Sequence, residues 1–230
     1  MSYGFQVEIS GDYACFSRPE LKVERVSYDI ITPSAARGIL EAIFWKPAMR
    51  YTIARIDVCA PIRYENIRRN EVNSKIPNSN PPAAAKKLQQ GNLYLAASAD
   101  RAQRAALVLR DVRYVVTGNF YINSERAAPG DTYAKFSSML NRRLEKGQNY
   151  HTPYLGTREF PARVRLIADG ETPPAPISET RSLGLMLYDI DYIKEVDKDG
   201  QEIVTAFSPM YFMAEMRNGV VDLRDVEVLR

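Results

Sequence analysis

Hydrophobic and polar residues alternate along several parts of the chain, and this period of two predicts β-strands. The stronger runs predict strands over 4–16, with a bend or bulge at Gly11-Asp12, and over 51–64, 112–122 and 163–168. A weaker run predicts a short strand over 93–98. Hairpin-turn signals at Asp199-Gly200 and Asn218-Gly219 accompany short predicted strands over 184–193, 203–213 and 220–223.

Residues 32–47 follow the helical period instead. Thr32 can cap this helix, and Pro33 fits its first turn. The apolar positions that recur at helical spacing are Ile39, Leu40 and Ile43. We expect Pro47 to end the helix, which leaves Phe44, Trp45 and Lys46 at its carboxyl end. Phe44 and Trp45 are expected to be core or interface aromatics.

A second helix is predicted over 131–146. Asp131 or Thr132 can cap it, and Gly147 ends it. Its apolar stripe consists of Tyr133, Phe136, Leu140 and Leu144. Its basic residues off that stripe are Lys135, Arg142, Arg143 and Lys146.

The order strand, helix, strand, strand, helix, strand is typical of ferredoxin-like domains, a pattern that RNA-recognition domains share. We therefore predict an α+β protein with a ferredoxin-like (RNA-recognition-motif-like) domain over 1–168. A proline-rich linker then leads into a small antiparallel β-sheet domain over 169–230. Residues 65–92 show no clear apolar period, which predicts an exposed excursion such as a long hairpin. This excursion is basic and carries Arg68, Arg69, Lys75, Lys86 and Lys87.

Charge divides the chain at the same place. Residues 1–168 carry 25 Lys and Arg against 15 Asp and Glu, a balance of +10, whereas 169–230 carry 6 against 13, a balance of −7. Of the 31 basic residues 22 are Arg, whose planar guanidinium suits phosphates and bases. A solvated Arg-rich surface would give the same composition, but the segregation favours nucleic acid as the partner of the first part. The acidic part is expected to face protein or to keep the chain in solution.

Composition excludes several classes of protein. The chain has 230 residues, of which 45% are hydrophobic, as in ordinary globular proteins. No apolar run approaches the ~20 residues that span a bilayer, and the start lacks a signal-peptide pattern, so we expect a cytoplasmic protein without membrane contact. The two cysteines are isolated and His151 is the only histidine, which excludes a zinc module and a His-rich metal site. The common phosphate-loop, dinucleotide and hydrolase motifs are absent, and no cofactor or metal is expected.

A basic surface with interleaved aromatics remains as candidate chemistry. Lys135 is predicted in the first turns of a capped helix, where the helix dipole and free N–H groups favour phosphate. A solvated helix lysine is the plainer interpretation. His151 is either a surface residue or an acid–base group, since histidine is the side chain that ordinarily titrates near neutral pH. Arg158 is either an ion-pair partner of Glu159 or a phosphate clamp.

Five collinear segments lie between residues 11 and 162. They are GDYACFSRPELKVERVSYDIITPSAARGILEAIFWKP at 11–47, APIRYENIRRNEV at 60–72, DRAQRAALVLRDVRYVV at 100–116, FSSMLNRRLEKGQ at 136–148 and YLGTREFPA at 154–162. These segments resemble the CRISPR-associated Cas5 family in its type I-C (Dvulg) subtype. The resemblance implies an RNA-recognition-like domain, a small C-terminal sheet, and an endoribonuclease that cuts precursor CRISPR RNA at each repeat. It also implies that the protein stays on the 5′ handle of the guide, beside the backbone and large subunits of a surveillance complex.

The resemblance further implies cleavage without a metal ion, by attack of the neighbouring 2′-hydroxyl, which leaves a 2′,3′-cyclic phosphate. The family's catalytic set is a tyrosine at the end of the first helix and a Lys-His pair that opens the second. The matching residues here are Phe44, Lys135 and Phe136, so only the lysine is retained. Tyr133, His151 or another neighbour would then act as the base, or the protein cuts slowly, or it only binds. The expected RNA-binding residues are Arg68, Arg69, Lys75, Arg142, Arg143 and Arg158.

Three hypotheses follow. The first is a repeat-specific endoribonuclease in which Lys135 stabilises the pentavalent phosphate. The second is a structural subunit that holds the 5′ handle without cutting. The third is a protein that binds duplex DNA or RNA without sequence specificity through its basic part.

Overall fold

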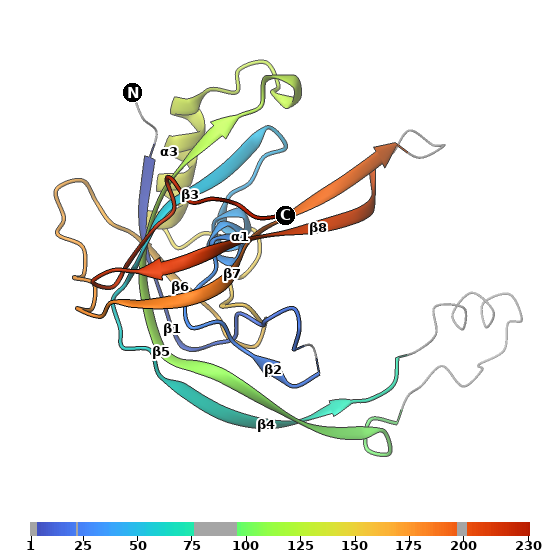
Figure 1. Cartoon of the computed structure of the whole chain (residues 1–230). Coiled ribbons are helices and arrows are strands. Elements are labelled where there is room, and N and C mark those ends of the chain that lie inside the picture. The colour runs from blue at the N-terminus through green and yellow to red at the C-terminus, as the bar shows by residue number, and fades with distance from the viewer. Residues whose placement is uncertain (1–3, 22, 76–95, 197–201) are drawn as a thin grey trace, which may run out of the picture.

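The computed structural model describes residues 4–21, 23–75, 96–196 and 202–230. In these ranges the chain is mostly antiparallel sheet with two α-helices, which confirms the α+β class. Figure 1 shows the helices beside a central sheet, a two-stranded arm that leaves the body, and a C-terminal hairpin.

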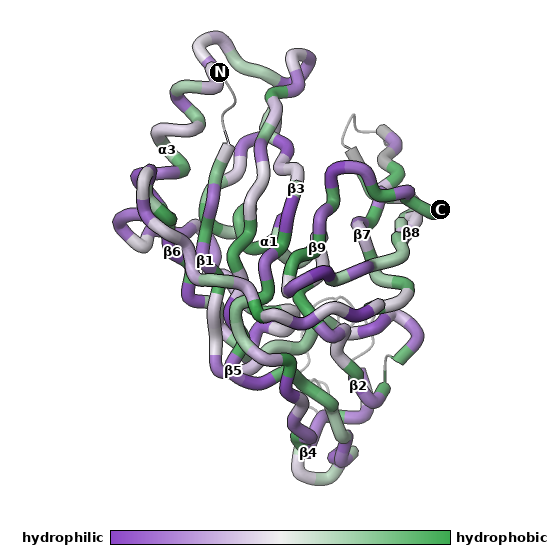
Figure 2. Tube along the Cα trace, turned by 60° about the vertical axis from the view of Figure 1, so that its left-hand side comes forward, coloured by the Kyte–Doolittle hydropathy of each residue, from purple (hydrophilic) through white to green (hydrophobic). Residues whose placement is uncertain are grey.

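The central sheet contains seven strands. Its main path runs through β6 (Arg163–Leu166), β1 (Gly4–Ala14), β5 (Arg101–Ile122), β3 (Met49–Val58) and β9 (Val220–Asp222), and each pair of neighbours is antiparallel. The short β2 (Arg25–Val26) and β4 (Tyr64–Val72) also pair with β5. On β1, Val7 and Ile9 are fully buried. Gln6 and Glu8 therefore point to the other side of the sheet, because strand residues alternate between faces. Figure 2 colours the strands of this sheet by hydropathy, with hydrophobic and hydrophilic positions mixed along them.

β5 is the longest strand and belongs to two parts of the molecule. Its second half pairs with β1 and β3 in the body, and its first half pairs with β4 along the arm. The two halves meet near Asp111, which has a positive φ of 53°. Asp111 lies opposite the bend predicted at Gly11-Asp12. The arm of β4 and the first half of β5 thus departs from the body where the backbone changes direction (Figure 1).

Helix α1 (Pro33–Ile43) begins as predicted. The Thr32 hydroxyl accepts a hydrogen bond from the backbone N–H of Ala35 at 3.2 Å, and Pro33 occupies the first turn. Its buried face packs against β3, β7 and α3, and consists of Pro33, Ala36, Ile39, Leu40 and Ile43.

The predicted carboxyl end of this helix is wrong. The helix ends at Ile43, and Phe44 has the extended dihedrals φ −147° and ψ 124°. Since successive side chains of an extended backbone point to opposite sides, Phe44 is buried and Trp45 is exposed. Side-chain donors satisfy the carbonyls at this earlier end, Arg143 that of Ile43 at 2.6 Å and the Tyr51 hydroxyl that of Phe44 at 2.8 Å, and the aromatic pair lies outside the helix.

Helix α3 (Tyr133–Glu145) confirms the second predicted helix with slightly shorter bounds. Its cap is Thr132, whose hydroxyl accepts from the backbone N–H of Lys135 at 3.2 Å. Phe136, Leu140 and Leu144 are buried, whereas Tyr133 is 39% exposed. Tyr133 is therefore only partly a member of the apolar stripe.

The C-terminal part contains a long hairpin of β7 (Arg181–Val196) and β8 (Glu202–Met216). The turn predicted at Asn218-Gly219 is confirmed, since both residues have a positive φ, 49° and 73°. Val220, the first residue of the next strand, β9, closes this turn by backbone bonds to Arg217, and β9 then pairs with β3. The last predicted strand therefore belongs to the central sheet.

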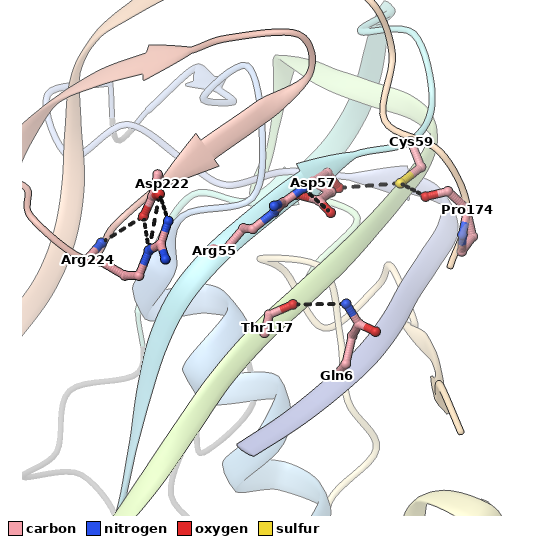
Figure 3. A network of polar contacts seen from close by, with 8 residues as sticks. All are labelled: Gln6, Arg55, Asp57, Cys59, Thr117, Pro174, Asp222 and Arg224. Carbon is pink, nitrogen blue, oxygen red and sulfur yellow. Dashed lines mark hydrogen bonds and ion pairs between the residues drawn. The ribbon is translucent and has the colours of Figure 1, made fainter. Parts of the chain in front are cut away.

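Polar contacts join the residues after 168 to the central sheet. The backbone N–H of Ile177 donates to the carbonyl of Val58 at 2.8 Å. The Cys59 thiol lies 3.5 Å from the carbonyl of Pro174, as Figure 3 shows. Leu183 and Leu223 lie in the same buried cluster as residues of β1, β3 and β5. The division at residue 168 stays a prediction, and many contacts cross it.

Three further strand predictions need correction. The expected strand 51–64 is two segments, because β3 ends at Val58 and β4 begins at Tyr64, with Pro61 between them. The strand expected over 112–122 begins earlier, at Arg101. Residues 96–98, expected to end the short strand over 93–98, lead into and form part of a turn over 97–99 instead. Residues 93–95, Lys86, Lys87 and Asp199-Gly200 lie outside the described residues.

Candidate active site and nucleic-acid interface

Lys135 lies in the first turn of α3 with 47% of its side chain exposed. Its ammonium donates to the carboxylate of Asp131 at 3.0 Å and lies 3.5 Å from the carbonyl of Gly130. The hydrogen bond from Lys135 lowers the pKa of Asp131, so this carboxylate is charged at neutral pH. A cation at the positive end of a helix, held by one surface carboxylate, can exchange that carboxylate for a phosphate oxygen.

Phe44 and Phe136 meet at the junction of α1 and α3. Their ring centroids are 5.9 Å apart at an interplanar angle of 79°, an edge-to-face contact. Both side chains are buried, with 1% and 0% exposure. The fold thus brings together the three positions implied by the resemblance, but only Lys135 has access to solvent.

Tyr133 and His151 occupy different surroundings. The Tyr133 hydroxyl accepts from the backbone N–H of Ile122 at 3.2 Å, and its ring stacks on Phe120 with centroids 5.8 Å apart. The exposed His151 lies beyond the carboxyl end of α1, where its backbone N–H donates to the carbonyl of Ala42 at 3.0 Å. Its ring contacts Tyr150 at 4.5 Å. A role as general base for either residue stays a prediction.

The cations of the arm differ in how they are held. Arg68 and Lys75 are exposed, and neither side chain has an ion-pair partner in the described part of the chain. Arg69 is half-buried and pairs with Glu159, a hydrogen bond that raises the pKa of Arg69. Arg68 and Lys75 are therefore free to contact phosphate, whereas Arg69 ties the arm to the loop at 150–161.

The three remaining predicted RNA-binding arginines also separate by environment. Arg142 is exposed on α3. Arg143 donates to the carbonyl of Ile43 at 2.6 Å, so it caps the carboxyl end of α1. Arg158 is exposed, and its neighbour Glu159 pairs with Arg69 instead. The ion-pair interpretation of Arg158 thus has no support in the structure.

The sheet face opposite the helices is covered with paired polar groups. Glu8 bonds to Arg113 at 2.7 Å and to Arg165 at 2.7 Å. Burial opposes ionisation of Glu8, but these hydrogen bonds lower its pKa. Figure 3 shows Gln6 and Thr117 paired on the same face. The centre of this face therefore presents ion pairs, where RNA-recognition domains stack bases on aromatic rings.

A groove of about 540 Å³ opens between the ends of β3 and β5, helix α1 and the C-terminal hairpin. Three aromatic side chains about half exposed line it: Trp45, Tyr121 and Tyr192. Of these three residues, only Trp45 is predicted from the sequence as a core or interface aromatic. Tyr121 and Tyr192 come from separate strands, so their proximity depends on the sheet register and on the docking of the hairpin.

A metal centre and a membrane-spanning helix are absent from the described residues. No three of their His, Cys, Asp and Glu side chains come together in a way that could hold a metal ion. None of their helices has the length and apolar character needed to cross a membrane.

Known proteins resemble this chain over nearly its full length. A family model described as CRISPR-associated protein (Cas_Cas5) matches residues 4–224. A "CRISPR pre-crRNA endoribonuclease Cas5d" from Mannheimia succiniciproducens is 45% identical over 229 residues, which covers 97% of this chain and 96% of the relative. A protein of the same name from Thermus thermophilus is 39% identical, with 95% and 90% of the two chains covered.

Solved structures show the same fold. A crystal structure titled CRISPR-associated protein has a TM-score of 0.66 at 22% identity, and covers 99% of this chain and 96% of its own. A functionally uncharacterized protein from Streptococcus mutans has a TM-score of 0.64 at 22% identity, with 96% and 92% covered. The full-length family match and the two curated relatives show that the chain belongs to the CRISPR-associated Cas5 family.

Proposed function

We propose that this chain is an endoribonuclease that cuts precursor CRISPR RNA within its repeat. The observation that carries the proposal is Lys135, a half-exposed ammonium at the capped start of α3, beside the junction with α1. Two relatives at 45% and 39% identity bear the name CRISPR pre-crRNA endoribonuclease, which supports the same activity here.

In the proposed reaction a 2′-hydroxyl of the RNA loses its proton and attacks the adjacent phosphorus. The bond from phosphorus to the 5′-oxygen breaks, that oxygen takes up a proton, and the products are a 2′,3′-cyclic phosphate and a 5′-hydroxyl. The phosphorane between them carries extra negative charge. Lys135 and the positive end of the α3 dipole would stabilise this charge without a metal ion. Tyr133 and His151 are the candidates for moving the protons.

The test is the single-turnover cleavage rate of Lys135→Ala on the protein's own repeat RNA. Removal of one charge-stabilising donor typically costs about 2.7–4 kcal/mol, so we expect a rate at least tenfold below wild type. Lys146→Ala is the matched control, because it removes the same charge from the opposite end of α3. Equal rates for the two variants would remove Lys135 from the mechanism.

The two buried phenylalanines favour a second candidate, a subunit that holds the 5′ handle without cutting. Phe44 and Phe136 have no group that can transfer a proton. In this case wild type binds its repeat RNA without cleaving it, and the double variant Phe44→Tyr, Phe136→His gains cleavage. Cleavage by wild type would discard this candidate.

The strand order β6-β1-β5-β3, with α1 between β1 and β3 and α3 between β5 and β6, supports a ferredoxin-like assignment for the first part. For the acidic part we propose protein partners, the backbone and large subunits of a surveillance complex in the cytoplasm. Exposed apolar side chains on the hairpin, such as Leu185, Phe207 and Met213, support a protein interface there.

A further inference from the structure

The groove between β3 and the C-terminal hairpin has the shape and the side chains of a nucleobase site. Its volume of about 540 Å³ falls within the range of small-molecule sites. Trp45, Tyr121 and Tyr192 are 47%, 52% and 51% exposed and line it from three separate segments of the chain. Exposed aromatic rings that converge on one groove are the usual platform for unpaired bases.

The charges of the groove are divided between its two sides. Arg37 is bound to Asp189 at 2.7 Å and to Glu41 at 2.7 Å, so these three groups largely satisfy one another. Asp191 and Arg50 also line the groove, and neither has an ion-pair partner in the part of the chain that the structure describes. Arg50 lies beside Tyr121 on the neighbouring strand. The hairpin side therefore offers a carboxylate that accepts hydrogen bonds, and the β3 side offers a cation.

The groove also adjoins the cations at the start of α3. Trp45 faces the groove, and the next residue, Lys46, lies close enough to Asp131 to lower its pKa together with Lys135, whose hydrogen bond is the larger cause. The segment that lines the groove at Trp45 therefore continues directly into a cation on the side of α3.

We propose that this groove binds one unpaired base of the RNA, stacked among Trp45, Tyr121 and Tyr192. The base presents N–H donors to Asp191, and guanine fits best because its edge carries two adjacent donors. A carboxylate repels phosphate, so the groove takes the base and leaves the backbone to Arg50 and the cations near α3. This inference rests on the proposed RNA function and assigns it a site that reads the identity of a base.

Trp45 is the only tryptophan of the chain, so its fluorescence reports directly on the groove. The probe is a short single-stranded guanosine oligonucleotide with 2′-O-methyl sugars, which cannot be cleaved by the proposed reaction. We expect saturable quenching of Trp45. The same sugar-phosphate backbone without bases should still bind, as measured by the fluorescence anisotropy of an attached dye, but it should not quench Trp45. Replacement of guanosine by inosine, which lacks one donor, should weaken binding several-fold, and Asp191→Asn should remove that preference.

Tyr192→Ala should weaken the affinity for the guanosine oligonucleotide, measured by quenching of Trp45, by about tenfold, which is the usual effect of one lost stacking partner. Phe207→Ala is the matched control, since Phe207 is paired with Tyr192 across the hairpin, is exposed, and does not line the groove. Equal affinities for the two variants, or equal quenching by the abasic backbone, would overturn the inference even if the protein cleaves its repeat. If quenching depends on the base but the protein never cleaves its repeat, the base-binding inference stands and the proposed nuclease activity is wrong.

Discussion

Gly156 shows how a single residue fixes the loop at 150–161. It has a φ of +85°, and a Cβ atom there would lie 1.9 Å from the carbonyl oxygen of Cys15. The loop can therefore approach β1 only without a side chain at this position. The adjacent backbone bond from the N–H of Cys15 to the carbonyl of Leu155, at 3.0 Å, depends on the same approach.

We predict that Gly156→Ala lowers the free energy of unfolding by about 3 kcal/mol or more, since steric overlap adds to left-handed strain. Gly170→Ala is the matched control, because Gly170 has a φ of +82° but open space around its Cα. That variant should lose only about 1–2 kcal/mol. Urea denaturation of both proteins measures the difference, and equal losses would contradict the steric argument.

The sequence predicts the chemical character of single residues better than it predicts their exposure and their partners. The capped position of Lys135 followed from Thr132 and the helical period, and the structure confirms it. The exposure of Trp45 could not be predicted, because it depends on the extended backbone at Phe44. Arg69 and Arg143 looked like any exposed arginine, yet each is held by a partner distant in sequence, Glu159 and Ile43.

At the scale of elements, the ion pairs of Glu8 connect β1 to both of its neighbours in the sheet, β5 through Arg113 and β6 through Arg165. The folded-state pKa of Glu8 is lowered, so its ionised form stabilises the native sheet. This stabilisation is complete above the ordinary pKa of a glutamate and disappears as the pH falls through the lowered value.

Glu8→Gln should therefore reduce the free energy of unfolding by about 1–3 kcal/mol at pH 7. The difference in the free energy of unfolding between this variant and wild type should shrink as the pH falls below about 4.3. Urea titrations across this range measure it, with the exposed Glu227→Gln as a control. A gap that does not change with pH would show that the Glu8 ion pairs are not its source.

The arm of β4 and β5 allows a second test at this scale. Arg68 and Lys75 are exposed, whereas Arg69 holds the arm to Glu159, so the first two are the better probes of RNA contact. Arg68→Glu with Lys75→Glu should weaken RNA binding and flatten the plot of log K against log salt by about 0.7 per lost phosphate contact.

Arg217→Glu with Arg230→Glu makes the same charge change at exposed positions of the acidic part. This control should keep the wild-type slope. An unchanged slope in the arm variant would exclude the arm as an RNA-holding element.

The elements themselves were largely predictable, but their extents were not. Caps and hydrophobic period located α1 and α3, because these signals are local. The first half of β5 exists because it pairs with β4. β4 has only alternating exposed and half-buried positions, so its sequence predicts a polar excursion and not a strand. The pairing of β9 with β3 is likewise a long-range contact that no local pattern encodes.

For the whole molecule, the contacts across residue 168 predict coupled unfolding. Leu223 is 4% exposed, and its backbone N–H donates to the carbonyl of Ala54 at 2.9 Å, so the last strand completes the core of the first part. We expect the urea transitions followed by Trp45 fluorescence and by far-ultraviolet circular dichroism to coincide. Leu223→Ala should lower the free energy of unfolding by about 2–5 kcal/mol and move both transitions together to lower urea concentrations. Two separate transitions would instead support independent domains.

The central claim is that the chain cuts RNA through the RNA's own 2′-hydroxyl, with Lys135 stabilising the phosphorane. The most direct measurement uses wild-type protein, its own repeat RNA, and the same RNA with one 2′-deoxy sugar at the cleavage position, both in EDTA. We predict cleavage of the first RNA to a 2′,3′-cyclic phosphate and tight binding of the second without cleavage. Cleavage of the 2′-deoxy RNA, or loss of all cleavage in EDTA, would contradict this mechanism.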